Sequence, residues 1–169
     1  ASQLGEVHLL VAGSGCAAVA DQAAQIAGVG KVHLADDAAY ANALAENVAP
    51  LVVDLMGHHD AFVAPATTNG KNIAPRVAAL LDVMQLSDIL SVEGNNTFTR
   101  PIYAGNAIAR VESSDPKLVV TVRGTAFART STPAGWIEVD STHLDSPGHL
   151  NPPEDPYAMT PAASTSGST

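Results

Sequence analysis

The chain has 169 residues, of which 46% are hydrophobic and only 4% aromatic, and its formal net charge is −9. This length suits one ordinary domain with a tail, and the acidic charge excludes a nucleic-acid backbone as a partner. Cys16 is the single cysteine, which excludes an internal disulfide and a cysteine-rich zinc site and favours a reducing compartment. No apolar run is long enough for a bilayer, and no signal peptide opens the chain, so we expect no direct membrane insertion.

The first half of the chain alternates apolar strands with amphipathic helices. We expect strands at 6–12, 31–35 and 61–66, and helices at 16–28, 37–57 and 70–85. Pro50 predicts a kink in the second helix, whereas Pro75 is expected near the first turn of the third, where a missing N–H costs little. The expected buried face of that third helix consists of Ile73, Val77, Leu80, Leu81 and Met84.

The pattern changes after a fourth strand, expected at 88–93. Residues 97–103 and 107–113 indicate a hairpin, and 117–125 adds another strand. Strand–helix alternation followed by a hairpin predicts an α/β fold. We expect a Rossmann-like, mostly parallel sheet flanked by helices, with an antiparallel hairpin at one edge.

The last quarter of the chain has a different composition. Residues 129–169 contain 6 of the 11 prolines and many Ser and Thr, with little periodicity. Such a segment buries too little apolar surface to offset its ordering entropy. We therefore expect a folded domain at 1–128 and a disordered Pro/Ser/Thr-rich tail at 129–169.

A glycine-containing turn follows the first expected strand. Gly13, Gly15 and Ala18 fit the G-x-G-x-x-A form of the dinucleotide fingerprint, and Asp36 and Asp37 end the next strand, where an acid would hold a ribose. Such glycines let a pyrophosphate approach a helix N-terminus. A short glycine turn is also an ordinary strand-to-helix connection, and this reading is favoured over cofactor binding.

Two cations stand near the start of the third helix. Lys71 and Arg76, with Asn72 between them, oppose the helix macrodipole, which favours anions at that end. They call for an acidic partner, either a phosphate or a carboxylate from elsewhere in the fold or from another subunit. A structural or interface role is favoured over ligand binding.

The hairpin carries a second polar motif. Arg100 enters the turn, Tyr103 begins it, and Gly105 and Asn106 are the residues expected at positive φ. A structural hairpin is the favoured interpretation of these residues.

Arg123 lies within the last expected strand, where an unpaired guanidinium is costly to bury. We expect it to pair with an acid such as Glu93 or Asp88.

Neither a catalytic nor a metal-binding constellation is expected. His58 and His59 are adjacent, so they point in different directions, and we find no further ligand at zinc spacing. Cys16 at a helix start is expected to have a lowered pKa, but no base accompanies it.

Four segments resemble the alpha subunit of electron transfer flavoprotein, in its N-terminal domain. They are GKNIAPRVAALLD (70–82), SDILSVEG (87–94), RPIYAGNAIA (100–109) and VTVRGTAF (120–127), and the likeness runs from Glu6 to about Phe127. The resemblance implies a heterodimer with a beta subunit that contains FAD. Such a heterodimer carries electrons from acyl-CoA and other flavin dehydrogenases to a membrane quinone reductase, as in fatty acid beta-oxidation.

The resemblance also sets limits. It implies a first strand before Ala1 and a C-terminal FAD-binding domain, and neither is present, so no flavin-contacting residue is expected here. The chain is then a scaffold and beta-subunit-binding domain of an electron carrier, inactive alone, from a bacterial cytoplasm or, if eukaryotic, a mitochondrial matrix. Two alternatives stay open: a small dinucleotide-binding protein that uses Gly13, Gly15 and Asp36, and a fragment that does not fold.

Overall fold

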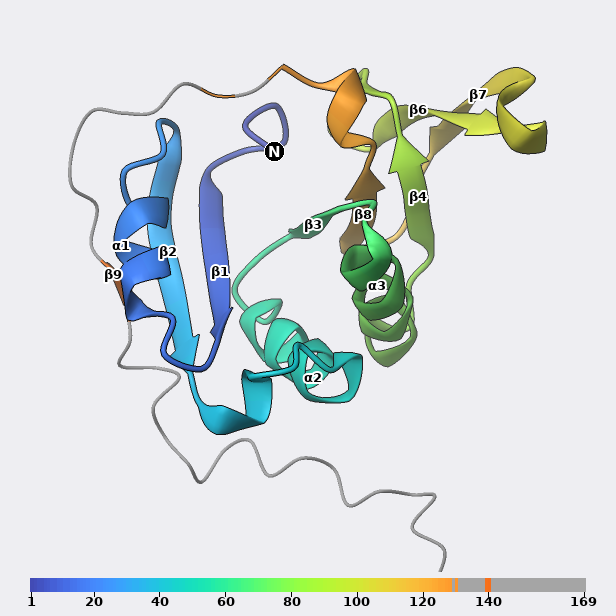
Figure 1. The fold of residues 1–169 in the computed structure, drawn as a ribbon. Helices are drawn as coiled ribbons and strands as arrows, with labels where there is room; N and C mark the ends of the chain where they lie inside the picture. Colours follow the sequence, from blue (N-terminus) through green and yellow to red (C-terminus); the bar gives the residue numbers. More distant parts are fainter. Residues whose placement is uncertain (129, 131–138, 141–169) are drawn as a thin grey trace, which may run out of the picture.

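The computed structural model describes residues 1–128, 130 and 139–140 (Figure 1). Strands and helices alternate at first and a hairpin follows. The helices are α1 (Ala17–Ala23), α2 (Ala45–Leu55) and α3 (Thr68–Leu81), with short 3-10 turns at Ala38–Tyr40, Tyr103–Gly105 and Gly124–Ala126. The strands are β1 (Val7–Gly13), β2 (Val29–Asp36), β3 (Ala61–Pro65), β4 (Gln85–Ile89), β5 (Ser91–Val92), β6 (Thr97–Ile102), β7 (Ala107–Glu112), β8 (Leu118–Val122) and β9 (Val139–Asp140).

The described strands form two parallel sheets and one antiparallel sheet. Parallel pairing gives the orders β1-β2-β9 and β3-β8-β4, whereas β5-β6-β7 is antiparallel. Helices α2 and α3 pack against each other, and α1 covers β2 at the other end of the molecule (Figure 1). The Rossmann-like α/β class is therefore confirmed, with the parallel strands divided between two sheets.

Three apolar clusters hold these layers together. The largest joins α2 and α3 to β8 through Leu51, Val77 and Val119, each with no exposed surface. A second packs α1 on β2, and a third anchors the hairpin on β4 and β8 through Phe98 and Val120. The core contains mostly small aliphatic side chains, as the low aromatic content predicts.

The first two helices are shorter than expected. Helix α1 ends at Ala23, because Gln25 and Ile26 form i→i−3 bonds and Gly28 takes a φ of +86°. The expected helix at 37–57 breaks at Ala43, whose φ is +48°, into a 3-10 turn and α2. Pro50 lies inside α2, so the interruption comes before the proline.

Helix α3 begins at Thr68 and ends at Leu81, so Pro75 lies in its interior and not in its first turn. The expected buried face is partly wrong, because Leu80 is 58% exposed and Met84 73% exposed. The helix stops before Met84, and its buried stripe runs through Gly70, Ala74, Val77 and Ala78. Leu80 follows Ala78 by two residues, about 200° around the helix, and therefore faces away from this stripe.

The hairpin is confirmed, with β6 and β7 paired in register from Thr97–Glu112 to Ile102–Ala107. Its turn differs in detail: Tyr103, Ala104 and Gly105 take positive φ, whereas Asn106 is helical at −73°. The expected strand at 88–93 divides into β4 and β5.

The expected disorder of 129–169 falls almost wholly outside the described residues. Within that segment Val139–Asp140 forms β9, parallel to β2, so at least these two residues adopt regular structure. In the described part of the chain, no helix is both long and apolar enough to cross a membrane.

Candidate functional site

The carboxyl ends of β3, β4 and β8 meet at one edge of their sheet. Val122 at the end of β8 lies opposite Pro65 of β3 and Ile89 of β4. An open pocket of about 860 Å³ is lined there by polar and apolar residues, among them Lys71, Asp88, Arg123 and Phe127. This edge is where open α/β sheets commonly bind ligands and partners.

Asp88 and Arg123 both line this pocket and form an ion pair. Arg123 Nε donates to Asp88 Oδ1 at 3.2 Å, and a second guanidinium nitrogen donates to the other carboxylate oxygen. Asp88 has a φ of +59° at a register shift in β4, and its N–H donates to Thr121 Oγ1 at 2.9 Å. The expected pairing of Arg123 is confirmed with Asp88, while Glu93 accepts instead from Arg110 at 2.9 Å.

The pocket carries more positive than negative charge. The hydrogen bond from Arg123 holds the pKa of Asp88 below its ordinary value, against the opposing effect of partial burial. The charges of Arg123, Lys71 and Arg100 lower it further. Arg100 Nε is buried without a hydrogen-bond partner among the described residues. The arrangement therefore favours an anionic group at this edge.

The expected acidic partner of Arg76 lies within the chain. Arg76 Nη2 donates to Glu46 Oε1 of α2 at 2.5 Å, and both side chains are about half exposed. Lys71 lines the pocket instead, and Asn72 is exposed beside it. Helix α3 thus directs one cation toward α2 and the other toward the strand ends.

A side-chain-to-backbone hydrogen bond stabilises the turn of the hairpin. Asn106 Nδ2 donates to the Tyr103 carbonyl at 3.0 Å, while the Tyr103 side chain is 79% exposed. Arg100, in contrast, lies in the middle of β6 opposite Ala109.

The glycine turn between β1 and α1 is occupied by a side chain of the protein itself. The N–H groups of Gly15 and Cys16 donate to the carboxylate of Asp36 at 2.6 and 3.0 Å. These are the donors that the dinucleotide hypothesis assigns to a pyrophosphate. Asp37 also binds backbone, accepting from the N–H of Ala39 at 2.8 Å.

Comparison with known proteins gives the family. Residues 1–144 match the electron transfer flavoprotein domain. The chain belongs to the electron transfer flavoprotein family. The match extends beyond Phe127, where the four segments quoted above end.

Several relatives are alpha subunits of electron transfer flavoprotein. That of Pseudomonas aeruginosa is 55% identical over 136 residues, which cover 80% of this chain and 44% of the relative. That of Paracoccus denitrificans is 54% identical over 124 residues, covering 73% and 40%. The mitochondrial one of Dictyostelium discoideum is 43% identical over 152 residues, covering 85% and 43%. The chain spans less than half the length of these relatives.

The surroundings of Cys16 in this electron transfer flavoprotein family member raise the pKa of its thiol. Burial is the main cause, and the negative charge of Asp36 raises the pKa further. The expectation of a lowered pKa was wrong, because burial and the nearby carboxylate both disfavour the thiolate.

The structure brings together three histidines that sequence spacing did not connect. His8 of β1, His33 of β2 and His59 after α2 offer ring nitrogens within 4.8 Å of one another. The expectation of no metal ligands considered only the adjacent His58 and His59. One signal was available, since His8 and His33 each lie in an apolar strand of the same sheet.

Proposed function

We propose that this chain is the scaffold and beta-subunit-binding domain of an electron transfer flavoprotein alpha subunit. The observation that carries the proposal is the match of residues 1–144 to the family, with relatives that are alpha subunits and are matched over less than half of their own length. The domain is part of an electron carrier and has no catalytic activity by itself.

FAD belongs, in this proposal, to the complete heterodimer and lies outside this chain. One structural feature supports that assignment: the amide donors of the glycine turn are already bound to Asp36. The resemblance supports the same assignment, because it implies flavin contacts in a following domain.

The proposed docking surface for the beta subunit combines α3 with the hairpin. The hairpin projects away from the parallel sheets in Figure 1, and it exposes Tyr103 and Ile108 by 79% and 59%. Exposed apolar side chains beside polar ones are typical of interaction surfaces. Lys71 and Asn72 of α3 complete this surface and suit an acidic region of the partner.

The edges of β1 and β3 support the expectation of a strand before residue 1. Each is the terminal strand of its parallel sheet in the described chain. An unpaired edge exposes a row of backbone donors and acceptors that a further strand satisfies.

The heterodimer would carry electrons from acyl-CoA and other flavin dehydrogenases to a quinone reductase, as in fatty acid beta-oxidation. We place it in a bacterial cytoplasm or a mitochondrial matrix. The mitochondrial location is supported by the relatives from Dictyostelium discoideum and Caenorhabditis elegans, which are named mitochondrial.

The test is co-expression with the beta subunit of a close relative. We expect a stable 1:1 complex on size-exclusion chromatography and no flavin absorption bands from the chain alone. Lys71→Glu and Tyr103→Asp are expected to weaken the complex, whereas Asp21→Lys on the distant α1 should not. Stoichiometric flavin in the chain alone, or a complex insensitive to both surface substitutions, would contradict the proposal.

The two alternatives have their own readouts. Tight NADH binding that Gly15→Val abolishes would favour the dinucleotide hypothesis. A broad thermal transition with exposed apolar surface would favour a fragment that does not fold, whereas a sharp cooperative transition would argue against it.

A further inference from the structure

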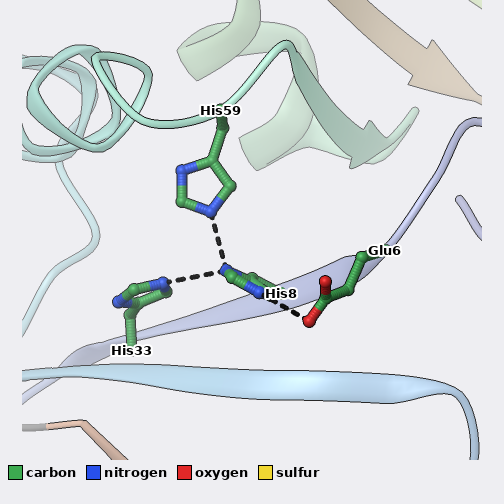
Figure 2. Close-up of polar contacts among 4 residues, drawn as sticks. All are labelled: Glu6, His8, His33 and His59. Carbon is green, nitrogen blue, oxygen red and sulfur yellow. Dashed lines mark hydrogen bonds and ion pairs between the residues drawn. The ribbon is translucent and has the colours of Figure 1, made fainter.

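Three imidazole rings meet on one side of the β1-β2 sheet (Figure 2). His8 Nδ1 lies 2.8 Å from His59 Nε2 and 3.4 Å from His33 Nε2. The ring centroids are 4.9 to 5.6 Å apart. His33 is buried at 8% exposure, and the other two are partly buried.

The strand register explains why two of the rings are neighbours. Lys31 lies opposite His8, and His33 lies opposite Leu10 in the parallel ladder. Side chains two residues apart share a face of a strand, so His8 and His33 are diagonal neighbours on one face. His59 lies in the connection from α2 to β3, and its ring contacts His8 on that face. Residues from three segments therefore converge without any short spacing in the sequence.

The outer nitrogens of two rings are already bound to acceptors. His59 Nδ1 lies 2.8 Å from the Leu55 carbonyl, and His8 Nε2 lies 3.3 Å from the Glu6 carboxylate. Both partners accept hydrogen bonds only, so each of these nitrogens is the protonated one in a neutral ring. The lone pairs of His8 Nδ1 and His59 Nε2 then face each other across 2.8 Å. Two such lone pairs repel unless a cation lies between them.

We propose that His8 Nδ1, His33 Nε2 and His59 Nε2 bind one Zn²⁺ ion, with water as a fourth ligand. Zn–N bonds of about 2.0–2.1 Å in tetrahedral geometry put ligand nitrogens about 3.3 Å apart. The separations of 2.8 and 3.4 Å lie on either side of that value. The acceptors on the outer nitrogens, a carboxylate and a backbone carbonyl, are those that orient zinc-binding histidines.

The site has a structural consequence. It links β1 and β2 to the segment that enters β3, and so connects the two parallel sheets. A ligand that binds only the folded chain stabilises it by mass action. Zn²⁺ is therefore expected to raise the thermal transition of the chain, independently of flavin or of the beta subunit.

The experiment uses the whole 169-residue chain, without a histidine tag and freed of metal by chelation. Zn²⁺ alone is titrated by calorimetry, and Co²⁺ is added in parallel to report tetrahedral coordination in the visible spectrum. We expect one ion per chain and a higher transition temperature. His59→Gln and His33→Gln are each expected to weaken binding about 100-fold or more, and Glu6→Gln about 10-fold.

Two controls separate this site from other histidines. His58→Gln removes the exposed neighbour of His59 and should leave Zn²⁺ affinity unchanged. The double variant His143→Gln/His149→Gln should also leave Zn²⁺ affinity unchanged. Because His33 is buried, its variant is checked for folding without metal, and the partly buried His59 provides the independent test. Absence of Zn²⁺ binding by the wild-type chain, or binding that survives His59→Gln, would overturn the proposal.

Discussion

Arg123, which follows β8, donates two hydrogen bonds to the carboxylate of Asp88 near the end of β4. The pair joins two neighbouring strands where β4 departs from regular pairing, and it forms one wall of the pocket beside Lys71. The carboxylate there is therefore a structural counter-ion for the cations around it.

Asp88→Asn should change how stability depends on pH. The pKa of Asp88 is lowered in the folded state, mainly by Arg123, so the pair stabilises above the unfolded pKa of about 3.9 and is lost as pH falls through the folded value. Urea unfolding at pH 7 should show a small loss for the variant, because the pair is partly exposed. Below about pH 4, the free energy of unfolding should fall less steeply with decreasing pH in Asp88→Asn than in wild type. Asp21→Asn removes an exposed carboxylate from α1 and should keep the wild-type dependence of stability on pH.

Gly70→Ala should be strongly destabilising. A Cβ atom at this position in the first turn of α3 would lie 1.9 Å from the Pro65 carbonyl oxygen, so the helix must move away from β3. We expect a loss of roughly 3 kcal/mol, at the upper end for overpacking. Gly124→Ala is the matched control, since nothing lies within 4 Å of its added Cβ. Equal free energies of unfolding for the two variants would contradict the close approach.

Asp36→Ala should loosen the turn between β1 and α1. The variant leaves the N–H groups of Gly15 and Cys16 without their carboxylate acceptor, at a cost of about 0.5–2 kcal/mol. Asp36→Asn keeps one acceptor oxygen, so its stability should lie between that of Asp36→Ala and that of the wild type. Hydrogen exchange at the two amides gives a local readout, and unchanged protection would refute the capping role.

Phe98→Ala should separate the hairpin from the sheet. Phe98 has no exposed surface and packs with Ile89 and Val120, so its loss should cost about 3–5 kcal/mol in denaturant unfolding. Tyr103→Ala, in the exposed turn of the same hairpin, should change stability by no more than about 0.5 kcal/mol. A similar loss from both variants would show that the hairpin is not anchored through Phe98.

The Cys16 thiol should react slowly with a disulfide reagent at pH 8. Burial and the Asp36 charge raise its pKa, so the reactive thiolate fraction is smaller than in a free cysteine. Asp36→Asn removes the charge and should increase the rate. A rate above that of a model thiol would mean that the helix start dominates after all.

Local patterns predicted the hairpin and the existence of most elements correctly. Their ends were less predictable, because the interruption at Ala43 and the left-handed cap at Asp82, with φ of +48° and +54°, involve residues that rarely take such angles. The buried face of α3 was also misassigned in part. Its orientation depends on how closely Gly70 and Ala74 approach the sheet, and that distance is set by β3.

By itself, the sequence determined the α/β class, the family and the need of Arg123 for an acid, since these depend on periodicity, ordered motifs and the cost of an unpaired charge. Tertiary structure alone decided that Asp36 fills the glycine turn and that His8, His33 and His59 meet. The physical reason is sequence separation: Asp36 lies 21 residues from Gly15, and His59 lies 51 residues from His8. Such contacts follow from strand register and helix packing, which no local spacing encodes.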